Sequence, residues 1–306
     1  MSGSDEYSLA GEGLQRQPAC LVCATPTRFY FSKVYPSYPG SPFDAPLSVD
    51  YCRCPNCGFV LSRTHQAMSA ATWAALNTSW HHFYETNLDE KVSNAPPYAE
   101  QALALQMLAR NGLIDLDDAL DYAAGYGTLS KFLSRYFDRR LPIFDRYVHD
   151  PSGLSGIEEA ALGRYELVVN SAMFEHVLDR QALDEVDSLV SETGVLMLHT
   201  VVCERVPCDP NWFYLAPMVH TAFHTNRSMS LLMEQWGYEA SIYSPQAKSW
   251  WLFKRGSAAL KRLESTVERI NEELRMKYFH YRPGFVDYWK GFADPALVRP
   301  AIESVI

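Results

Sequence analysis

The stretch that decides the fold runs from Leu120 to Leu129 and reads Leu-Asp-Tyr-Ala-Ala-Gly-Tyr-Gly-Thr-Leu. A short apolar strand, predicted over 119–123, leads into a turn with glycines at 125 and 127, and a helix predicted over 128–137 follows at once. Glycine lets the backbone of such a turn approach a ligand closely, and the first turn of the helix offers free N–H groups. The stretch therefore predicts a strand–turn–helix unit that binds a ligand at its turn.

Short apolar runs alternate with helical stretches beyond this unit. The predicted strands are 141–144, 165–170, 194–202, 239–243 and 249–253, and the predicted helices between them are 180–190 and 228–236. Such alternation is typical of a mostly parallel sheet with helices on both faces. The first of these strands is followed by Asp145, and a carboxylate at that place can accept hydrogen bonds from both ribose hydroxyls of a nucleoside. The pattern predicts an α/β domain over residues 113–256 with a nucleoside site.

The glycine turn resembles the Asp-x-Gly-x-Gly-x-Gly pattern of the class I S-adenosylmethionine-dependent methyltransferases. Asp121, Gly125 and Gly127 match this pattern, whereas Ala123 stands where glycine is usual. The run from Tyr165 to Val177 reads Tyr-Glu-Leu-Val-Val-Asn-Ser-Ala-Met-Phe-Glu-His-Val and resembles the fourth strand of the same family with its Glu-His-Val continuation.

This resemblance covers residues 117–255 and implies a Rossmann-like methyltransferase domain with a mostly parallel seven-stranded sheet and S-adenosylmethionine as cofactor. It implies that the methionine part of the cofactor contacts Asp121, Ala123, Gly125 and Gly127, that the ribose contacts Asp145, and that Asn170 and Ser171 face the methyl-transfer cleft. Glu175 and His176 either contact substrate or only orient their loop. A nicotinamide-dependent enzyme and a Rossmann-like domain without a cofactor are the alternatives for the same strand–turn–helix unit.

Cysteine spacing predicts a metal site in front of this domain. Five of the seven cysteines lie within residues 18–66, and four of them form two Cys-x2-Cys pairs: Cys20 with Cys23, and Cys54 with Cys57. Two such pairs about 30 residues apart supply four thiolates, enough for a closed tetrahedral zinc site with a structural role. Cys52 is predicted to be a bystander, and Cys203 and Cys208 to be ordinary core or loop residues.

The absence of targeting signals in the sequence supports the choice of zinc over disulfides. No apolar run reaches the roughly 18 residues of a membrane span. Residues 1–17 are polar and carry no signal-peptide pattern. A cytoplasmic location is therefore expected, and cytoplasmic thiols are held reduced.

A histidine-bearing segment, from Trp212 to Asn226, follows the predicted strand 194–202. The cysteine pairs, the glycine turn and this segment occur in the order found in sugar methyltransferases that act on nucleotide-linked deoxy sugars, a group of C-methyltransferases. His220 falls where their histidine falls, although Pro217 to Val219 replace the tyrosine and glutamate that accompany it. The resemblance implies a sugar, sugar nucleotide or glycan as the methyl acceptor.

Methyl transfer usually requires removal of a proton from the acceptor, and histidine, with an ordinary pKa of about 6.5, can serve as the base. We expect His220 to be this base, ahead of His224 and then His199, and Tyr214 to orient the acceptor. Neighbouring His81 and His82 point to different helix faces, and they either form a lid or cleft wall or only pack against their surroundings.

Net charge and composition narrow the classes of partner. The formal net charge is −9 and no Lys/Arg-rich block occurs, which disfavours a nucleic-acid partner. Two further hypotheses are methylation of another small acceptor, an acid or a phenol, and a zinc-bearing binding scaffold without catalysis.

The predicted organisation is a disordered lead (1–17), a zinc module (18–66), a helical linker or lid (67–112), the Rossmann-like domain (113–256), and a C-terminal helix with an aromatic tail (257–306). A homodimer contact along the charged helix at 260–277 is an alternative to a merely solvated face.

Overall fold

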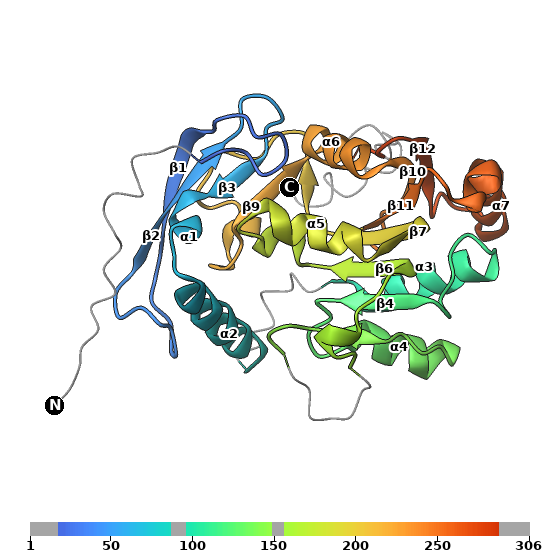
Figure 1. Cartoon of the computed structure of the whole chain (residues 1–306), viewed down its shortest axis with the longest axis horizontal. Helices are drawn as coiled ribbons and strands as arrows, with labels where there is room; N and C mark the ends of the chain where they lie inside the picture. The colour runs from blue at the N-terminus through green and yellow to red at the C-terminus, as the bar shows by residue number, and fades with distance from the viewer. Residues whose placement is uncertain (1–17, 87–95, 149–155, 288–306) are drawn as a thin grey trace, which may run out of the picture.

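Two β-sheets organise the computed structural model, which describes residues 18–86, 96–148 and 156–287 (Figure 1). The predicted lead over 1–17 and the last part of the aromatic tail, from residue 288 on, lie outside the described residues.

The larger sheet has seven strands in the order β12-β10-β11-β7-β6-β4-β5. Its strands are β4 (Ala119–Tyr122), β5 (Ile143–Phe144), β6 (Tyr165–Ser171), β7 (Val190–His199), β10 (Tyr238–Ser244), β11 (Ser249–Lys254) and β12 (His280–Pro283). Strands β7, β6, β4 and β5 pair in parallel. Strand β11 is antiparallel to both β7 and β10, so β10 runs in the same direction as the parallel group. The predicted α/β class, with a seven-stranded sheet and a parallel core, is confirmed.

Helices cover both faces of this sheet because its central strands are apolar on both sides. The helices are α3 (Tyr98–Arg110), α4 (Thr128–Phe137), α5 (Arg180–Ser188), α6 (Asn226–Trp236) and α7 (Leu263–Leu274). In β7, Leu196 and Leu198 join one core with side chains of α5 and α6, whereas Val195 and Met197 join the other with side chains of α3, α4 and α7. Successive side chains of a strand point to opposite faces, which explains the near-continuous apolar run.

The C-terminal side differs from the prediction in one boundary and in one additional strand. The charged stretch predicted as one helix over 257–278 is a 3-10 turn (Ala258–Arg262) followed by α7, which ends at Leu274. The next residue, Arg275, caps the helix with a left-handed φ of 53°. This helix buries Leu263, Val267 and Ile270, so it is a packing element as well as a charged surface. The polar strand β12 follows and adds an antiparallel edge to β10 that the sequence pattern did not indicate.

The smaller sheet joins the cysteine-rich region to the histidine-bearing segment. Its order is β1-β2-β3-β9-β8, with β1 (Arg28–Tyr35), β2 (Leu47–Arg53), β3 (Val60–Ser62), β8 (Val202–Cys203) and β9 (Ala222–Thr225). Strand β3 pairs with β9 at Val60–Phe223 and Leu61–Ala222. The residues before the first helix and those after β7 therefore form one sheet. Two helices, α1 (Arg63–Gln66) and α2 (Ala70–Thr86), follow β3.

Candidate functional site

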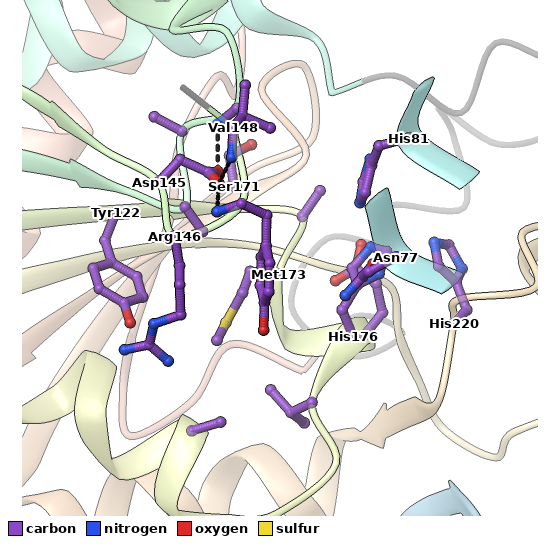
Figure 2. A pocket seen from close by; sticks show the side chains of 18 of the residues that line it. Asn77, His81, Tyr122, Asp145, Arg146, Val148, Ser171, Met173, His176 and His220 are labelled. Carbon is purple, nitrogen blue, oxygen red and sulfur yellow. Dashed lines mark hydrogen bonds between the residues drawn. The ribbon is translucent and has the colours of Figure 1, made fainter. Parts of the chain in front are cut away.

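A cavity of about 930 Å³ opens at the carboxyl ends of the parallel strands, the edge at which open α/β sheets bind ligands. One end is lined by Asp121 to Gly125, Asp145 to Val148 and Ser171, and the other by Asn77, His81, Glu175, His176, Tyr214 and His220. In the close-up of Figure 2, Met173 lies between these two groups. We call them the glycine-turn end and the histidine end.

The glycine turn follows β4 in a left-handed backbone conformation. Ala123, Gly125 and Gly127 have φ of 61°, 54° and 64°. A Cβ atom added at Gly125 would meet no heavy atom within 4 Å, so the turn borders open space. Gly127 is the N-cap of α4 and makes no side-chain cap, so this helix start offers backbone N–H groups. Ala123 adopts a conformation that costs a residue with a Cβ about 1–2 kcal/mol.

Asp145 is tied to this turn by its carboxylate. Oδ2 accepts a hydrogen bond of 2.8 Å from the N–H of Gly125, and Oδ1 accepts bonds of 2.8 Å from the N–H groups of Tyr147 and Val148. A carboxylate oxygen has about two lone-pair sites, so Oδ2 can still accept a hydrogen bond from a ligand. Asp145, which was expected near the glycine turn, therefore lies beside it, and its Oδ2 can accept one more hydrogen bond.

Asp121 lies at the end of β4 and is 3 % exposed. Burial, together with the nearby charge of Asp145, raises the pKa of its carboxyl group to about 8. Removing a carboxylate from water is costly unless a positive charge accompanies it. This end of the cavity therefore favours a cationic ligand group.

Asn170 and Ser171, which were expected to face the cleft together, point to opposite sides of β6. Ser171 lines the cavity, and its Oγ lies 3.3 Å from Nε2 of Gln101. Asn170 is fully buried, and its side-chain amide donates a 3.1 Å hydrogen bond to the carbonyl of Tyr122. Because side chains alternate along a strand, only one of two neighbours can face the cavity.

His220 presents one defined ring nitrogen at the histidine end. Its Nδ1 lies 2.7 Å from the carbonyl oxygen of Tyr214, which can only accept, so Nδ1 carries the proton. Nε2 is therefore the basic nitrogen. Burial lowers the pKa of this imidazole to about 4, which keeps the ring neutral.

Glu175 and His176, whose role the sequence left open, both line the same wall. The Glu175 carboxylate accepts hydrogen bonds of 2.7 Å from the hydroxyl of Tyr214 and 2.9 Å from that of Thr200. Burial raises its pKa to about 6. The ring of His176 is 5.0 Å from that of His220 between centroids.

The two other histidines weighed as bases occupy different places. His224 belongs to β9 and packs between the rings of Phe59 and Phe174, at centroid distances of 4.9 and 5.6 Å, and it does not line the cavity. His199 does line the cavity, with Nδ1 2.7 Å from the carbonyl of Lys248.

Helix α2 contributes lining residues that sequence reasoning mostly missed. Trp73, Asn77, Trp80 and His81 line the histidine end, whereas the neighbouring His82 does not. The aromatic and histidine cluster at residues 80–84 was the signal available for this wall. Asn77 carried no signal, because a single asparagine in a helix has no pattern around it.

Away from the cavity, four cysteine sulfurs converge. The Sγ–Sγ distances are 3.5 Å for Cys20–Cys57, 3.5 Å for Cys23–Cys54 and 3.8 Å for Cys23–Cys57, and none of these residues forms a disulfide. Four sulfurs at about 2.3 Å from a tetrahedral zinc ion would lie about 3.8 Å apart. The four thiols that the spacing predicted therefore fit a zinc ion, and the neighbouring Cys52 is outside the group.

Among the described residues, no helix combines the length and the apolar character needed to cross a membrane.

No protein-family model and no curated protein matches this chain. Among solved structures, it is similar to the plantazolicin methyltransferase BpumL in complex with a triazolic desmethylPZN analog and SAH, with 13 % identity and a TM-score of 0.38 over 66 % of this chain and 89 % of the other. It is also similar to the magnesium protoporphyrin IX methyltransferase ChlM from Synechocystis with bound SAH, with 14 % identity and a TM-score of 0.36 over 57 % and 90 %. A third is the O-methyltransferase of a trans-AT PKS multienzyme of Brevibacillus brevis in complex with S-adenosyl-L-homocysteine, with 12 % identity and a TM-score of 0.30 over 59 % and 69 %. Similarity at this level transfers no activity from these proteins to this chain.

Replacing Asp121 with Asn should stabilise the ligand-free protein at neutral pH. The folded-state pKa of about 8 lies above the usual value of 3.8, so this carboxyl group costs no stability below pH 4 and an increasing amount as the pH rises toward 8. We expect the free energy of unfolding of Asp121→Asn to exceed that of the parent by at least ~1 kcal/mol at pH 8, or about 2–4 °C in Tm. The difference should fade near pH 4. Thermal unfolding from pH 4 to 8 measures this, with the exposed Asp117→Asn as control. A difference that shrinks as the pH rises contradicts it.

Proposed function

We propose that this chain transfers the methyl group of S-adenosylmethionine to a small molecule bound at the histidine end of the cavity. The observation that carries this proposal is the glycine turn, held to the Asp145 carboxylate at the carboxyl edge of a parallel sheet and facing the same cavity as a wall of neutral histidines. One cavity with a nucleoside-type end and a proton-accepting end suits transfer between two bound molecules.

Residues at the glycine-turn end suit the cofactor part by part. The buried Asp121 is placed to hold the ammonium group of the methionine part, with the turn from Ala123 to Gly127 against its backbone. Oδ2 of Asp145 has capacity for a ribose hydroxyl, and Ser171 lies at the edge of the neighbouring strand. When bound, the cofactor supplies a methyl group activated by a sulfonium.

At the histidine end, we propose His220 as the base, through Nε2. Tyr214 holds this ring in position, because its carbonyl accepts a hydrogen bond from Nδ1–H of His220. Its hydroxyl donates to Glu175. His224 is a weaker choice than the sequence indicated, because its ring is enclosed by Phe59 and Phe174.

The wall formed by α2 supports a ring-shaped acceptor. Trp73 and Trp80 offer aromatic faces, Asn77 of the same helix offers an amide group, and Gln66 of α1 adds an amide oxygen. Aromatic faces with hydrogen-bonding neighbours suit the apolar face and hydroxyl groups of a sugar. A sugar or sugar nucleotide therefore remains the acceptor class that we propose, in an enzyme of cytoplasmic carbohydrate or natural-product synthesis.

We also propose that Cys20, Cys23, Cys54 and Cys57 bind a structural zinc ion. The closed set of four thiolates leaves no position for substrate. Its link to the cavity is mechanical: Thr225, the N-cap of α6, donates a 2.6 Å hydrogen bond to the carbonyl of Cys57, and the strand that contains Thr225 begins two residues after His220.

Cofactor binding should depend on Asp145. Asp145→Ala removes three hydrogen bonds that hold the turn and its loop, together with the oxygen offered to the ribose. Charged hydrogen bonds contribute about 1.5–3 kcal/mol, so we expect affinity for S-adenosylmethionine to fall by about tenfold or more in calorimetry. The exposed Asp118→Ala, just before the neighbouring strand β4, is the matched control. Parent-like affinity in Asp145→Ala would remove the basis of the proposal.

Turnover should depend on His220 much more strongly than cofactor binding does. In His220→Asn the side-chain amide can still donate to the carbonyl of Tyr214, but no basic nitrogen remains. Loss of a general base costs about 10²–10⁴-fold in rate, so label transfer from methyl-tritiated S-adenosylmethionine should fall by about that factor, with cofactor affinity within about twofold of the parent. His199→Asn is the control from the same cavity. An equal or larger loss there would assign the base to His199 instead.

Zinc removal should loosen the fold and the cavity together, because metal binding and folding are coupled. We expect one zinc ion per chain by elemental analysis, and a loss of at least ~2 kcal/mol of stability, or about 4–8 °C in Tm, after chelation or in Cys54→Ser. Cys52→Ser should keep both the zinc and the melting temperature. Zinc content that Cys54→Ser leaves unchanged would contradict this assignment.

A further inference from the structure

The histidine end presents hydrogen-bond acceptors that lack donors. Oδ1 of Asn77 is buried without a hydrogen-bond partner among the described residues, and so is Nδ1 of His176. A backbone hydrogen bond at Val219 engages the ring of His176, which commits its proton and makes Nδ1 an acceptor. Nε2 of His220 is a further acceptor, because the proton is on Nδ1. Figure 2 shows Asn77, His176 and His220 gathered on one side of the cavity.

The same place holds a buried negative charge without a cation. Glu175 is 2 % exposed, and no ion pair in the described part of the chain includes it. The histidines around it do not supply the charge, because burial and their mutual proximity lower the pKa of His176, and burial lowers those of His81 and His220. A buried carboxylate is stabilised by a cation that also donates hydrogen bonds. The missing group is therefore positively charged and rich in donors.

We propose that the methyl acceptor is an amine, whose nitrogen is bound by Glu175, His176 and His220. This deepens the methyl-transfer function proposed above and rests on it. A ring nitrogen of His176, a ring nitrogen of His220 and a carboxylate oxygen of Glu175 all lie within 4.8 Å of one another. A tetrahedral nitrogen that donates hydrogen bonds of about 2.9 Å to three acceptors places those acceptors about 4.7 Å apart. Oδ1 of Asn77 is available to a second donor of the substrate.

The reaction balances with these groups. Nε2 of His220 takes one proton from the bound ammonium, and the neutral amine then rotates about its carbon–nitrogen bond so that its lone pair faces the methyl group. That pair forms the nitrogen–carbon bond as the carbon–sulfur bond breaks and its electrons return to sulfur, so the positive charge moves from sulfur to nitrogen. The new methylammonium is again cationic, and the carboxylate of Glu175 holds it more strongly as that charge develops. Interactions that strengthen in the transition state are those that accelerate a reaction.

Paired probes test this inference. Benzylamine is compared with benzyl alcohol, and glucosamine with glucose, by ligand-observed NMR on the full chain saturated with S-adenosylhomocysteine. Hydrogen bonds to charged groups contribute about 1.5–3 kcal/mol, so each amine should bind about tenfold or more tightly than its alcohol. In Glu175→Gln this preference should fall to about twofold or less. Glu185→Gln is the charge-matched control, because Glu185 lines the same cavity but pairs with Arg146, and it should keep the preference.

A second variant covers the case in which Glu175→Gln fails to fold. His176→Leu removes an uncharged acceptor of the amine at similar volume and should weaken benzylamine binding severalfold more than benzyl alcohol binding. The inference is overturned if neither amine is preferred in the parent, whether both probes bind alike or neither binds. It is also overturned if manganese or zinc, added beyond the ion at the four cysteines, binds stoichiometrically and is lost in His176→Ala, because the missing cation is then a metal. Calorimetry with S-adenosylhomocysteine on the same sample reports separately on the methyltransferase proposal.

Discussion

Parallel strands that share a direction have their carboxyl ends at one edge of a sheet, and this constraint places the glycine-turn end of the candidate site. Strands β4, β6 and β7 end at Tyr122, Ser171 and His199, and all three residues line one cavity. The turn after β4 can sit beside Asp145 only because β5 pairs with β4 in parallel and ends at the same edge. The hydrogen bond from the N–H of Gly125 to Asp145 then connects the loop after β4 to the loop after β5.

A second sheet supports the segment that contains His220 and makes the cysteine region part of the site's framework. The pairing of β3 with β9 fixes where the backbone after His220 runs, and the bond from Thr225 to the carbonyl of Cys57 anchors the next helix to the cysteine turn. A metal ion held by the four cysteines would thus support the position of His220 through a continuous backbone ladder, because none of these cysteines lines the cavity.

Buried carboxylates stand at both ends of the cavity. Asp121 at the glycine-turn end and Glu175 at the histidine end both have pKa values raised by burial. Each is a cost to the empty protein that a cationic ligand group removes. An S-adenosylmethionine ammonium at one end and a substrate amine at the other would leave both charges compensated, which links ligand occupancy to stability.

The sequence by itself determined the α/β class, the strand–turn–helix unit with its borders at Thr128 and Phe137, and the four cysteines that converge, because these depend on local periodicity, on glycine conformation and on short spacings. Other features were decided only by the tertiary structure. The alternation of side chains turned Asn170 away from the cavity while Ser171 faces it, and it placed His224 between two phenyl rings. Asn77 and Glu175 met His176 and His220 through contacts between segments far apart in the chain. Long-range packing leaves no periodic trace in the sequence, so no local pattern could have brought these residues together.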